Sequence, residues 1–255
     1  MSGLLFACDI DNTLIYSHRH PHPGWPCVER LGDREQAFMS PKTARLYGML
    51  RERLSVALVT SRSVEQLRRL RLPGGLPVAV AANGADLLLD GEIDTAWRRE
   101  TDRLVAPWRG ELERLRVKLG GVERYDRCRV VDDAGLFILC GDGTEPRAEA
   151  LSLARETALE AVASGRKLYL LPPPLNKGTA LARLMKRLGF TRSVAAGDSA
   201  MDLPMLRAAD IAIAPGELAE ALSGETRACP PDRLFSEFAL ETALEISERH
   251  EVRLP

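Results

Sequence analysis

Near the start of the 255-residue chain lies the segment Leu4-Leu5-Phe6-Ala7-Cys8-Asp9-Ile10-Asp11-Asn12-Thr13. Its apolar first half is typical of a buried strand, and its polar second half is typical of the loop that follows the carboxyl end of such a strand. Asp9 and Asp11 are two residues apart, so in extended chain both carboxylates point to the same side, about 7 Å apart. Two like charges placed in this way favour a cation beside them, although a solvated loop has the same composition.

Strands and helices alternate on both sides of a central segment. Before residue 85 we expect strands at 4–10, 55–59 and 78–82 and helices at 40–54 and 64–70; after residue 175 we expect helices at 178–188 and from 203, and strands at 193–196 and 210–214. Polar residues follow most of these strands. This alternation predicts an α/β fold with a doubly wound, Rossmann-like parallel sheet, which binds ligands beyond the carboxyl ends of its strands.

Residues 85–174 have a different pattern, with expected strands at 85–89, 127–131, 136–140 and 167–171 and expected helices at 101–119 and 146–163. Asn83-Gly84 precedes this segment and Pro172-Pro173-Pro174 follows it. Turn residues of this kind mark domain boundaries. We therefore expect a core of residues 1–84 and 175–255, interrupted by an inserted α+β domain of residues 85–174.

Composition excludes several classes of protein. Apolar residues make up 45% and charged residues 28%, which is ordinary for a folded globular protein. The 35 Lys+Arg balance 36 Asp+Glu, so no charge excess favours nucleic acid or an anionic membrane. No apolar run approaches the roughly 18 residues of a membrane span. The five cysteines are scattered and unpaired in sequence, which favours a reducing, cytoplasmic location over disulfides or a zinc site.

Further polar residues stand at the ends of other expected strands or at helix starts. Thr60 follows the second strand, Lys177 opens the helix after the insert, and Asp198 and Asp202 form Gly-Asp-x-x-x-Asp after a later strand. Gly197 would allow the backbone to approach a ligand closely. Each has an ordinary explanation alone: Thr60 as a helix cap, Lys177 as an exposed lysine, Asp202 as an acid at a helix N-terminus. Because all of them are expected at one edge of the sheet, we favour the interpretation that they form a single functional site.

Together these residues resemble the four motifs of the haloacid dehalogenase superfamily of phosphatases. An insert between the second and third motifs is similar to the subgroup with a large α/β cap, which includes Cof-like, sucrose-phosphatase-like and mannosyl-3-phosphoglycerate-phosphatase-like proteins. The chain departs from that pattern at Asn12, where many relatives have glycine, at Met201, where one form of the last motif has asparagine, and in the long segment between Thr13 and Ser40. The matching positions are Asp9-x-Asp11-x-Thr13, Thr60, Lys177 and Gly197-Asp198-x-x-x-Asp202.

The resemblance implies a catalytic role for both early aspartates. Asp9 would attack phosphorus and form an aspartyl-phosphate, which water then hydrolyses. Asp11 would protonate the leaving oxygen and afterwards take a proton from that water, so we expect its pKa to rise when substrate binds. Thr60, Ser61 and Lys177 would bind the phosphoryl oxygens and stabilise the charge of the transition state.

The same resemblance implies a Mg²⁺ ion, because the site offers only hard oxygen ligands. The implied ligands are Asp9, Asp11 through its backbone carbonyl, and Asp198, with Asp202 as a further ligand or as an acceptor that supports one. Arginines of the insert at positions 98, 99, 124, 127 and 129 could contact substrate anions or simply lie at the surface. Weaker candidates for substrate contact, each of which could also be a turn residue, are Arg62, Asn83 and Asn176.

We therefore expect a Mg²⁺-dependent phosphomonoester hydrolase acting on a small phosphorylated metabolite, with a sugar phosphate as the leading choice and neither nucleic acid nor membrane as partner. A phosphomutase is an alternative that shares the aspartyl-phosphate. A receiver-like phospho-acceptor module is the alternative outside enzymes. The tract His18-x-His20-x-His22 suits a solvated flap better than a zinc site, because it lies in a Pro-rich loop without a fourth ligand. The oligomeric state does not follow from the sequence.

Overall fold

The structure, a computed structural model, describes residues 3–19 and 22–251. Its largest element is a sheet of eight strands. Strands β15 through β6 run parallel, whereas β7 and β8 run antiparallel to their neighbours. The strands lie in the order β15 (Glu225–Cys229), β14 (Ile211–Pro215), β13 (Arg192–Ala196), β1 (Leu4–Cys8), β5 (Ser55–Val59), β6 (Val78–Ala81), β7 (Asp86–Leu89) and β8 (Glu92–Ile93).

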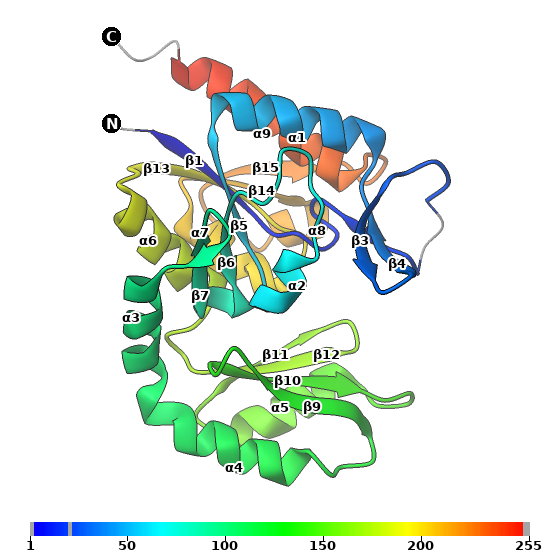
Figure 1. The fold of residues 1–255 in the computed structure, drawn as a ribbon, viewed down its shortest axis with the longest axis vertical. Helices are drawn as coiled ribbons and strands as arrows, with labels where there is room; N and C mark the ends of the chain where they lie inside the picture. The colour runs from blue at the N-terminus through cyan, green and yellow to red at the C-terminus, as the bar shows by residue number, and fades with distance from the viewer. Residues whose placement is uncertain (1–2, 20–21, 252–255) are drawn as a thin grey trace.

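Helices cover both faces of this sheet (Figure 1). Successive side chains of a strand point to opposite faces, so Phe6 and Cys8 pack on one side and Leu5 and Ala7 on the other. The first face is covered by α1 (Pro41–Arg53), α2 (Val64–Arg68) and α9 (Phe235–Glu251), and the second by α6 (Lys177–Leu188) and α7 (Leu203–Ala208). The predicted doubly wound fold is confirmed. Within the described ranges, every helix is too short or too polar to cross a bilayer.

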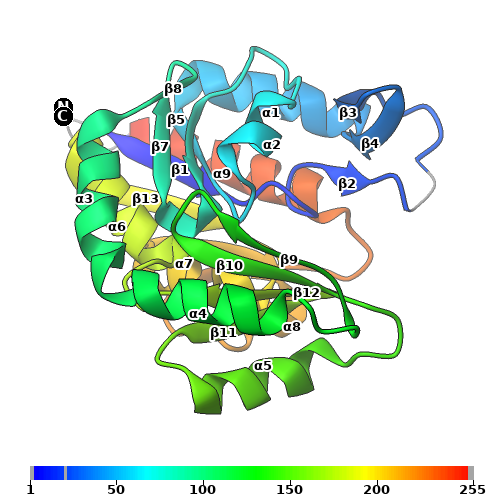
Figure 2. The same cartoon turned by 60° about the horizontal axis from the view of Figure 1, so that its bottom comes forward.

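A second, antiparallel sheet lies beyond the carboxyl edge of the first (Figures 1 and 2). Its strand order is β11 (Glu160–Ser164), β12 (Lys167–Leu171), β10 (Gly135–Cys140) and β9 (Tyr125–Val131). One face packs its apolar residues against α4 (Arg109–Leu119) and α5 (Pro146–Glu156). The other face is turned toward the large sheet. We call residues 109–171 the cap.

The inserted segment differs from the prediction in three places. β7 and β8 belong to the large sheet, because the chain reverses at Ala82–Gly84, where all three residues have positive φ, and returns antiparallel to β6. The boundary predicted at residue 85 therefore separates strands that pair. The helix predicted at 101–119 is two helices, α3 (Thr95–Val105) and α4, separated by a 3₁₀ turn at Ala106–Trp108 that contains proline. The helix predicted at 146–163 ends at Glu156, and the following residues form β11.

The long segment before α1 forms a small sheet that the sequence did not indicate, with the order β2 (Tyr16–Ser17), β4 (Arg34–Phe38) and β3 (Cys27–Leu31). The imidazole of His22 stacks on the Trp25 ring, 4.5 Å between centroids, and its Nε2 lies 3.1 Å from the carbonyl oxygen of Ser17. His20, in the middle of the predicted flap tract, lies outside the described residues. His22 therefore packs within the segment.

Arg183 of α6 fastens α3 to the core. Its guanidinium lies 3.8 Å from the centre of the Trp97 ring and donates to the backbone carbonyls of Gly84 (3.0 Å) and Trp97 (3.1 Å). The buried Trp97 donates its Nε1–H to the same Gly84 carbonyl at 3.0 Å. A cation stacked on an aromatic face is stabilising, and more so away from water. These contacts fix the chain at its turn after β6.

Replacing Trp97 with alanine should lower the free energy of unfolding by about 3–5 kcal/mol, because a large buried side chain is removed and a cavity remains. Urea denaturation followed by circular dichroism measures this loss. The matched control is Trp108→Ala. Because Trp108 is only partly buried, this variant should lose less free energy of unfolding. Equal losses for the two variants would contradict the assignment of Trp97 to the core.

Candidate active site

A buried lysine occupies the carboxyl edge of the large sheet. Lys177, the first residue of α6, is only 1% exposed. Its Nζ lies 2.8 Å from Asp9 Oδ1 and 2.6 Å from Asp202 Oδ1. Burial disfavours the ammonium form, but the charges and hydrogen bonds of Asp202 and Asp9 outweigh it and raise the pKa of Lys177. The lysine is therefore a fixed cation inside the protein.

Asn176 sets where α6 begins and so where Lys177 lies. Its Oδ1 accepts hydrogen bonds from the backbone N–H groups of Gly178 and Thr179, both at 3.0 Å, and Thr179 Oγ1 accepts from the Asn176 N–H at 3.2 Å. This reciprocal capping box satisfies donors that the first helical turn leaves free. The Asn176 side chain is thus engaged in the cap, and the substrate contact suggested for it stays a prediction.

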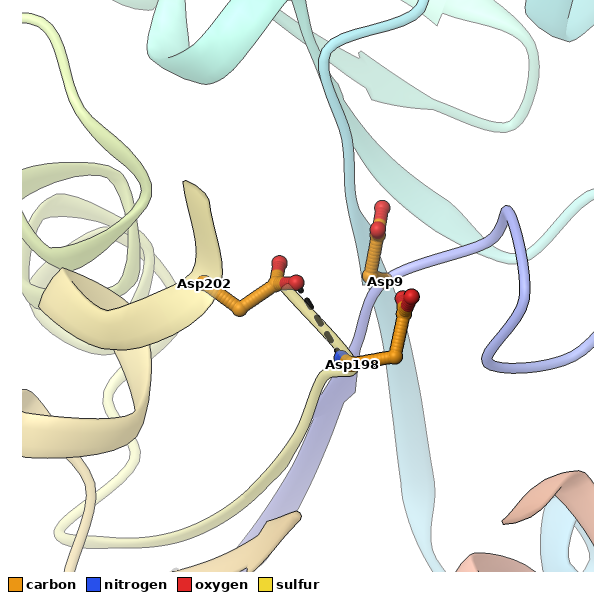
Figure 3. Close-up of side chains that lie close together, drawn as sticks. All are labelled: Asp9, Asp198 and Asp202. Carbon is orange, nitrogen blue, oxygen red and sulfur yellow. Dashed lines mark hydrogen bonds between the residues drawn. The ribbon is translucent and has the colours of Figure 1, made fainter. Parts of the chain in front are cut away.

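Asp202 holds the turn after β13 in place. Its Oδ2 accepts hydrogen bonds from the backbone N–H of Asp198 (3.2 Å), the backbone N–H of Ser199 (2.9 Å) and the Ser199 hydroxyl (2.8 Å); Figure 3 shows the first of these. A Cβ atom added at Gly197 would lie 2.4 Å from Asp202 Cβ. The close approach that Gly197 permits is therefore to the Asp202 side chain, whereas we expected a ligand there.

Three carboxylates gather beside Lys177. Asp9, Asp198 and Asp202 each offer an oxygen within 4.8 Å of the others (Figure 3). Such a set of hard oxygen donors fits Mg²⁺. Both oxygens of Asp202 already accept hydrogen bonds, whereas Asp198 accepts one, at Oδ1 from the Thr13 hydroxyl (3.0 Å). Asp9 and Asp198 are therefore the better placed to hold the ion.

The crowding of acids shows in their pKa values. Burial raises the pKa of Asp9 to about 7; Lys177 opposes this rise, and Asp202, Asp11 and Asp198 add to it. Burial and the charge of Asp202 raise the pKa of Asp198 to about 6. One lysine does not balance these carboxylates. Their ionised forms would be favoured by a further cation.

Asp11 has a different partner. Arg62 donates two hydrogen bonds to its carboxylate, Nε to Oδ2 at 2.9 Å and Nη2 to Oδ1 at 2.7 Å. Burial raises the pKa of Asp11, but the charge and hydrogen bonds of Arg62 outweigh burial and lower it overall. Asp11 is thus ionised in the substrate-free structure, and the rise expected on substrate binding stays a prediction.

Arg62 is itself held by an acid from the small sheet. Its Nη1 donates to Glu29 Oε2 at 2.7 Å, and the other Glu29 oxygen accepts from Arg69 Nη2 at 3.2 Å. Glu29 is 4% exposed. Sequence reasoning missed Glu29, because it lies in a polar segment whose strands were not expected. The partial alternation Cys27-Val28-Glu29-Arg30-Leu31 was the only local signal.

The second motif lies between the core and the cap. Thr60 is fully buried, and its Oγ1 accepts from the backbone N–H of Arg62 at 3.2 Å. The hydroxyl of Tyr169, in the cap, donates to Ser61 Oγ at 3.2 Å. Asn83 has φ 57° and donates its backbone N–H to the Thr60 carbonyl at 2.8 Å; its buried Oδ1 has no partner among the described residues. The structure therefore brings Thr60, Ser61 and Asn83 to the same edge as Asp11.

Both single-residue departures from the family pattern have a structural explanation. Asn12 has φ 57°, a left-handed conformation that asparagine tolerates better than most residues, so it replaces glycine at little cost. Met201 is buried and packs against Tyr169 and Leu171 of β12. It thus contributes to the contact between the core and the cap.

Comparison with known proteins agrees with this geometry. Residues 152–223 match the sequence family described as haloacid dehalogenase-like hydrolase. This match covers less than a third of the chain, from the end of the cap into the core. No curated protein matches the chain by sequence. The match agrees with the predicted superfamily and with the expectation of a hydrolytic enzyme, and the predicted fold class is confirmed.

Solved structures share the fold of this chain over nearly its whole length. The sucrose-phosphatase of Synechocystis, in complex with sucrose and phosphate, has a TM-score of 0.68 at 18% identity, covering 97% of this chain and 99% of its own. A trehalose-6-phosphate phosphatase related protein has a TM-score of 0.56 at 19% identity, covering 98% and 100%. A haloacid dehalogenase-like hydrolase from B. subtilis has a TM-score of 0.56 at 17% identity, covering 100% of both chains.

Glu29→Ala should lower the free energy of unfolding by about 3–5 kcal/mol, because it leaves the Arg62 guanidinium buried with one fewer partner. Urea denaturation provides the measurement. The control is Glu65→Ala, since Glu65 is 81% exposed and forms only a surface ion pair with Arg69, which contributes about 1 kcal/mol or less. A loss for Glu29→Ala as small as that of the control would contradict a supporting role for Glu29.

Asp198→Asn should raise the melting temperature of the metal-free protein at pH 8. The pKa of Asp198 in the folded state, about 6, lies above its ordinary value of 3.8. Its ionisation therefore destabilises the fold progressively between about pH 4 and pH 6, and above pH 6 by at most about 3 kcal/mol. Below about pH 4 the carboxyl is protonated in both states, and the gain over wild type should vanish. Thermal unfolding in EDTA at pH 8, 6 and 4 tests this; a gain that grows toward pH 4 would refute it.

Proposed function

We propose that this protein is a Mg²⁺-dependent phosphomonoesterase acting on a small phosphorylated metabolite, with a sugar phosphate as the first class to test. The observation that carries the proposal is the position of Lys177, whose Nζ lies 2.8 Å from Asp9 beside Asp198 and Asp202. A nucleophilic carboxylate, a fixed cation and a set of oxygen ligands are thus within reach of one phosphoryl group. The phosphatases among the structural neighbours support the same class of reaction.

In the first displacement, an Asp9 oxygen forms a bond to phosphorus while the bond from phosphorus to the leaving oxygen breaks. Lys177, together with the Thr60 and Ser61 groups at the same edge, balances the charge that spreads over the phosphoryl oxygens. Lys177 also lies against the carboxylate that attacks and so orients it. Mg²⁺, held by Asp9, the Asp11 backbone carbonyl and Asp198, would supply further positive charge. Asp202 supports the site by holding Lys177 and the turn at Asp198.

Asp11 then has to carry a proton. It donates one to the leaving oxygen in the first displacement and takes one from water in the second, when the bond from water oxygen to phosphorus replaces the bond to Asp9. In the substrate-free structure Arg62 holds Asp11 ionised. Substrate binding must therefore weaken the contact with Arg62 before Asp11 can act as an acid.

The five cysteines are free thiols, which supports the proposed cytoplasmic location.

Phosphate release from a panel of sugar phosphates, phosphoglycerates and nucleotides, with Mg²⁺ or EDTA, tests the proposal. We expect metal-dependent turnover that Asp9→Asn abolishes and that Lys177→Ala reduces by about 10²–10³ or more, since it removes a preorganised donor. The control Asp142→Asn alters a carboxylate that is 97% exposed and should leave turnover unchanged. Turnover that survives Asp9→Asn would exclude Asp9 as nucleophile. Transfer to a second hydroxyl in place of water would indicate a mutase.

A further inference from the structure

A small cavity adjoins Asp11 between the core and the cap. Its volume is about 100 Å³. The core contributes Asp11, Ser61 and Arg62 to its lining, and the cap contributes Arg129, Phe137 and Lys167. Because Asp11 is the proposed proton donor to the leaving oxygen, the cavity lies on the side where the organic part of the substrate departs. The side chains that line the cavity are therefore placed to contact that organic part.

The register of the cap sheet explains why two cations face this cavity. Arg129 lies opposite Phe137 on the neighbouring strand, and Phe137 lies opposite Tyr169. Residues two apart on a strand share a face, so Lys167 lies on the same face as Tyr169. The alternate residues of these strands, such as Ile138 and Leu168, pack into the apolar core of the cap. The positive charges are therefore confined to the face that meets the active site.

Both cations lack an acidic partner within the described ranges. Neither Arg129 nor Lys167 forms an ion pair there, and the buried Nε of Arg129 has no hydrogen-bond partner. Asp132, three residues along the same hairpin, instead accepts from the backbone N–H of Val64 at 3.1 Å. Three other cap arginines without an ion pair among the described residues, Arg127, Arg147 and Arg155, are exposed to water. Six arginines near or in the cap contact a carboxylate: Arg98, Arg109, Arg114, Arg116, Arg124 and Arg166.

A buried guanidinium N–H without an acceptor is costly, because the group has lost water and gained nothing in return. An anion in the cavity would satisfy it. The aromatic ring of Phe137, 5.7 Å from the Arg129 guanidinium carbon, steadies the side chain without neutralising it. Arg62 adds little net charge, since Asp11 and Glu29 already bind it. The cavity thus carries the surplus positive charge of Arg129 and Lys167.

We infer that Arg129 and Lys167 bind a second anionic group of the substrate, so that the preferred substrate is a phosphomonoester whose organic part also carries a carboxylate or another phosphate. This inference rests on the proposed function and narrows it. The cavity is smaller than the roughly 300–1,000 Å³ of pockets that enclose a drug-sized ligand, which suits a single anionic group better than a whole sugar ring. Arginine provides paired donors for such a group, and lysine provides a point charge.

The test compares substrates that differ only in the second anion: 3-phosphoglycerate with glycerol 3-phosphate, and fructose 1,6-bisphosphate with fructose 6-phosphate. The wild type should prefer the member that carries a second anionic group, in at least one pair, by about 10- to 100-fold in kcat/KM, the range expected for hydrogen bonds between charged groups. The pair that shows the preference identifies the anion as carboxylate or phosphate. Equal or higher kcat/KM for the member without the second anionic group, in both pairs, would overturn the inference.

Arg129→Met and Lys167→Met should each reduce that preference about tenfold or more, while the hydrolysis of p-nitrophenyl phosphate, which has no second anion, stays near the wild-type rate. Lys167 is exposed, so its variant is expected to fold normally even if Arg129→Met does not. The controls Arg155→Met and Lys186→Met remove the same charges at exposed helix positions away from the cavity and should change nothing.

The outcomes separate the two claims. If p-nitrophenyl phosphate is hydrolysed but the variants slow all substrates equally, the second-anion site is refuted and the phosphatase stands. A loss of preference in the two control variants as large as in Arg129→Met would likewise refute the site, because general surface charge would then explain it. If the wild type hydrolyses no compound at all, the proposed function fails and the inference fails with it.

Discussion

The Nζ atom of Lys177 lies between Asp9 and Asp202 at a place from which water is excluded. In such surroundings a charge is tolerated only with close partners of opposite sign, so each of the three groups requires the others. The arrangement joins the ends of three elements, since Asp9 follows β1, Lys177 starts α6 and Asp202 closes the turn after β13. Asp198 is positioned by the same carboxylate, because its backbone N–H donates to the other oxygen of Asp202. Contacts between charged groups thus hold the ends of these elements together at the edge of the sheet.

The two early aspartates have opposite environments although they are neighbours in sequence. Burial and adjacent acids raise the pKa of Asp9, whereas Arg62 lowers that of Asp11. The raised pKa of Asp9 is expected of a carboxylate whose ionised form needs a further cation. The lowered pKa of Asp11 is expected of a carboxylate that stays ionised until its contact with Arg62 is broken. Groups with divergent environments at one site are typical of divided roles in catalysis. Glu29 binds Arg62 and so connects Asp11 to the small sheet, which the long segment before α1 forms.

The sequence was sufficient for the part of the site that lies on regular strands. Asp9 and Thr60 each follow an apolar run that reads as a buried strand, and parallel strands bring such ends together. It was not sufficient for the contact of Arg62 with Glu29, because that pairing spans distant segments and depends on a small polar sheet without clear alternation. The sequence predicts helix over the short strand β11, because its residues, Glu-Ala-Val-Ala-Ser, follow a strong helical pattern. Pairing with β12 overrides that local preference.

The claim on which the account depends is that Asp9 becomes phosphorylated during turnover. Rapid mixing of enzyme, Mg²⁺ and substrate, followed by acid quench, proteolysis and mass spectrometry, measures this directly. The account predicts one added phosphoryl group on the peptide that contains Asp9, transient in the wild type and longer-lived in Asp11→Asn, where the water-activating base is missing. A peptide that stays unmodified throughout turnover, or a phosphoryl group on a different residue, would contradict it.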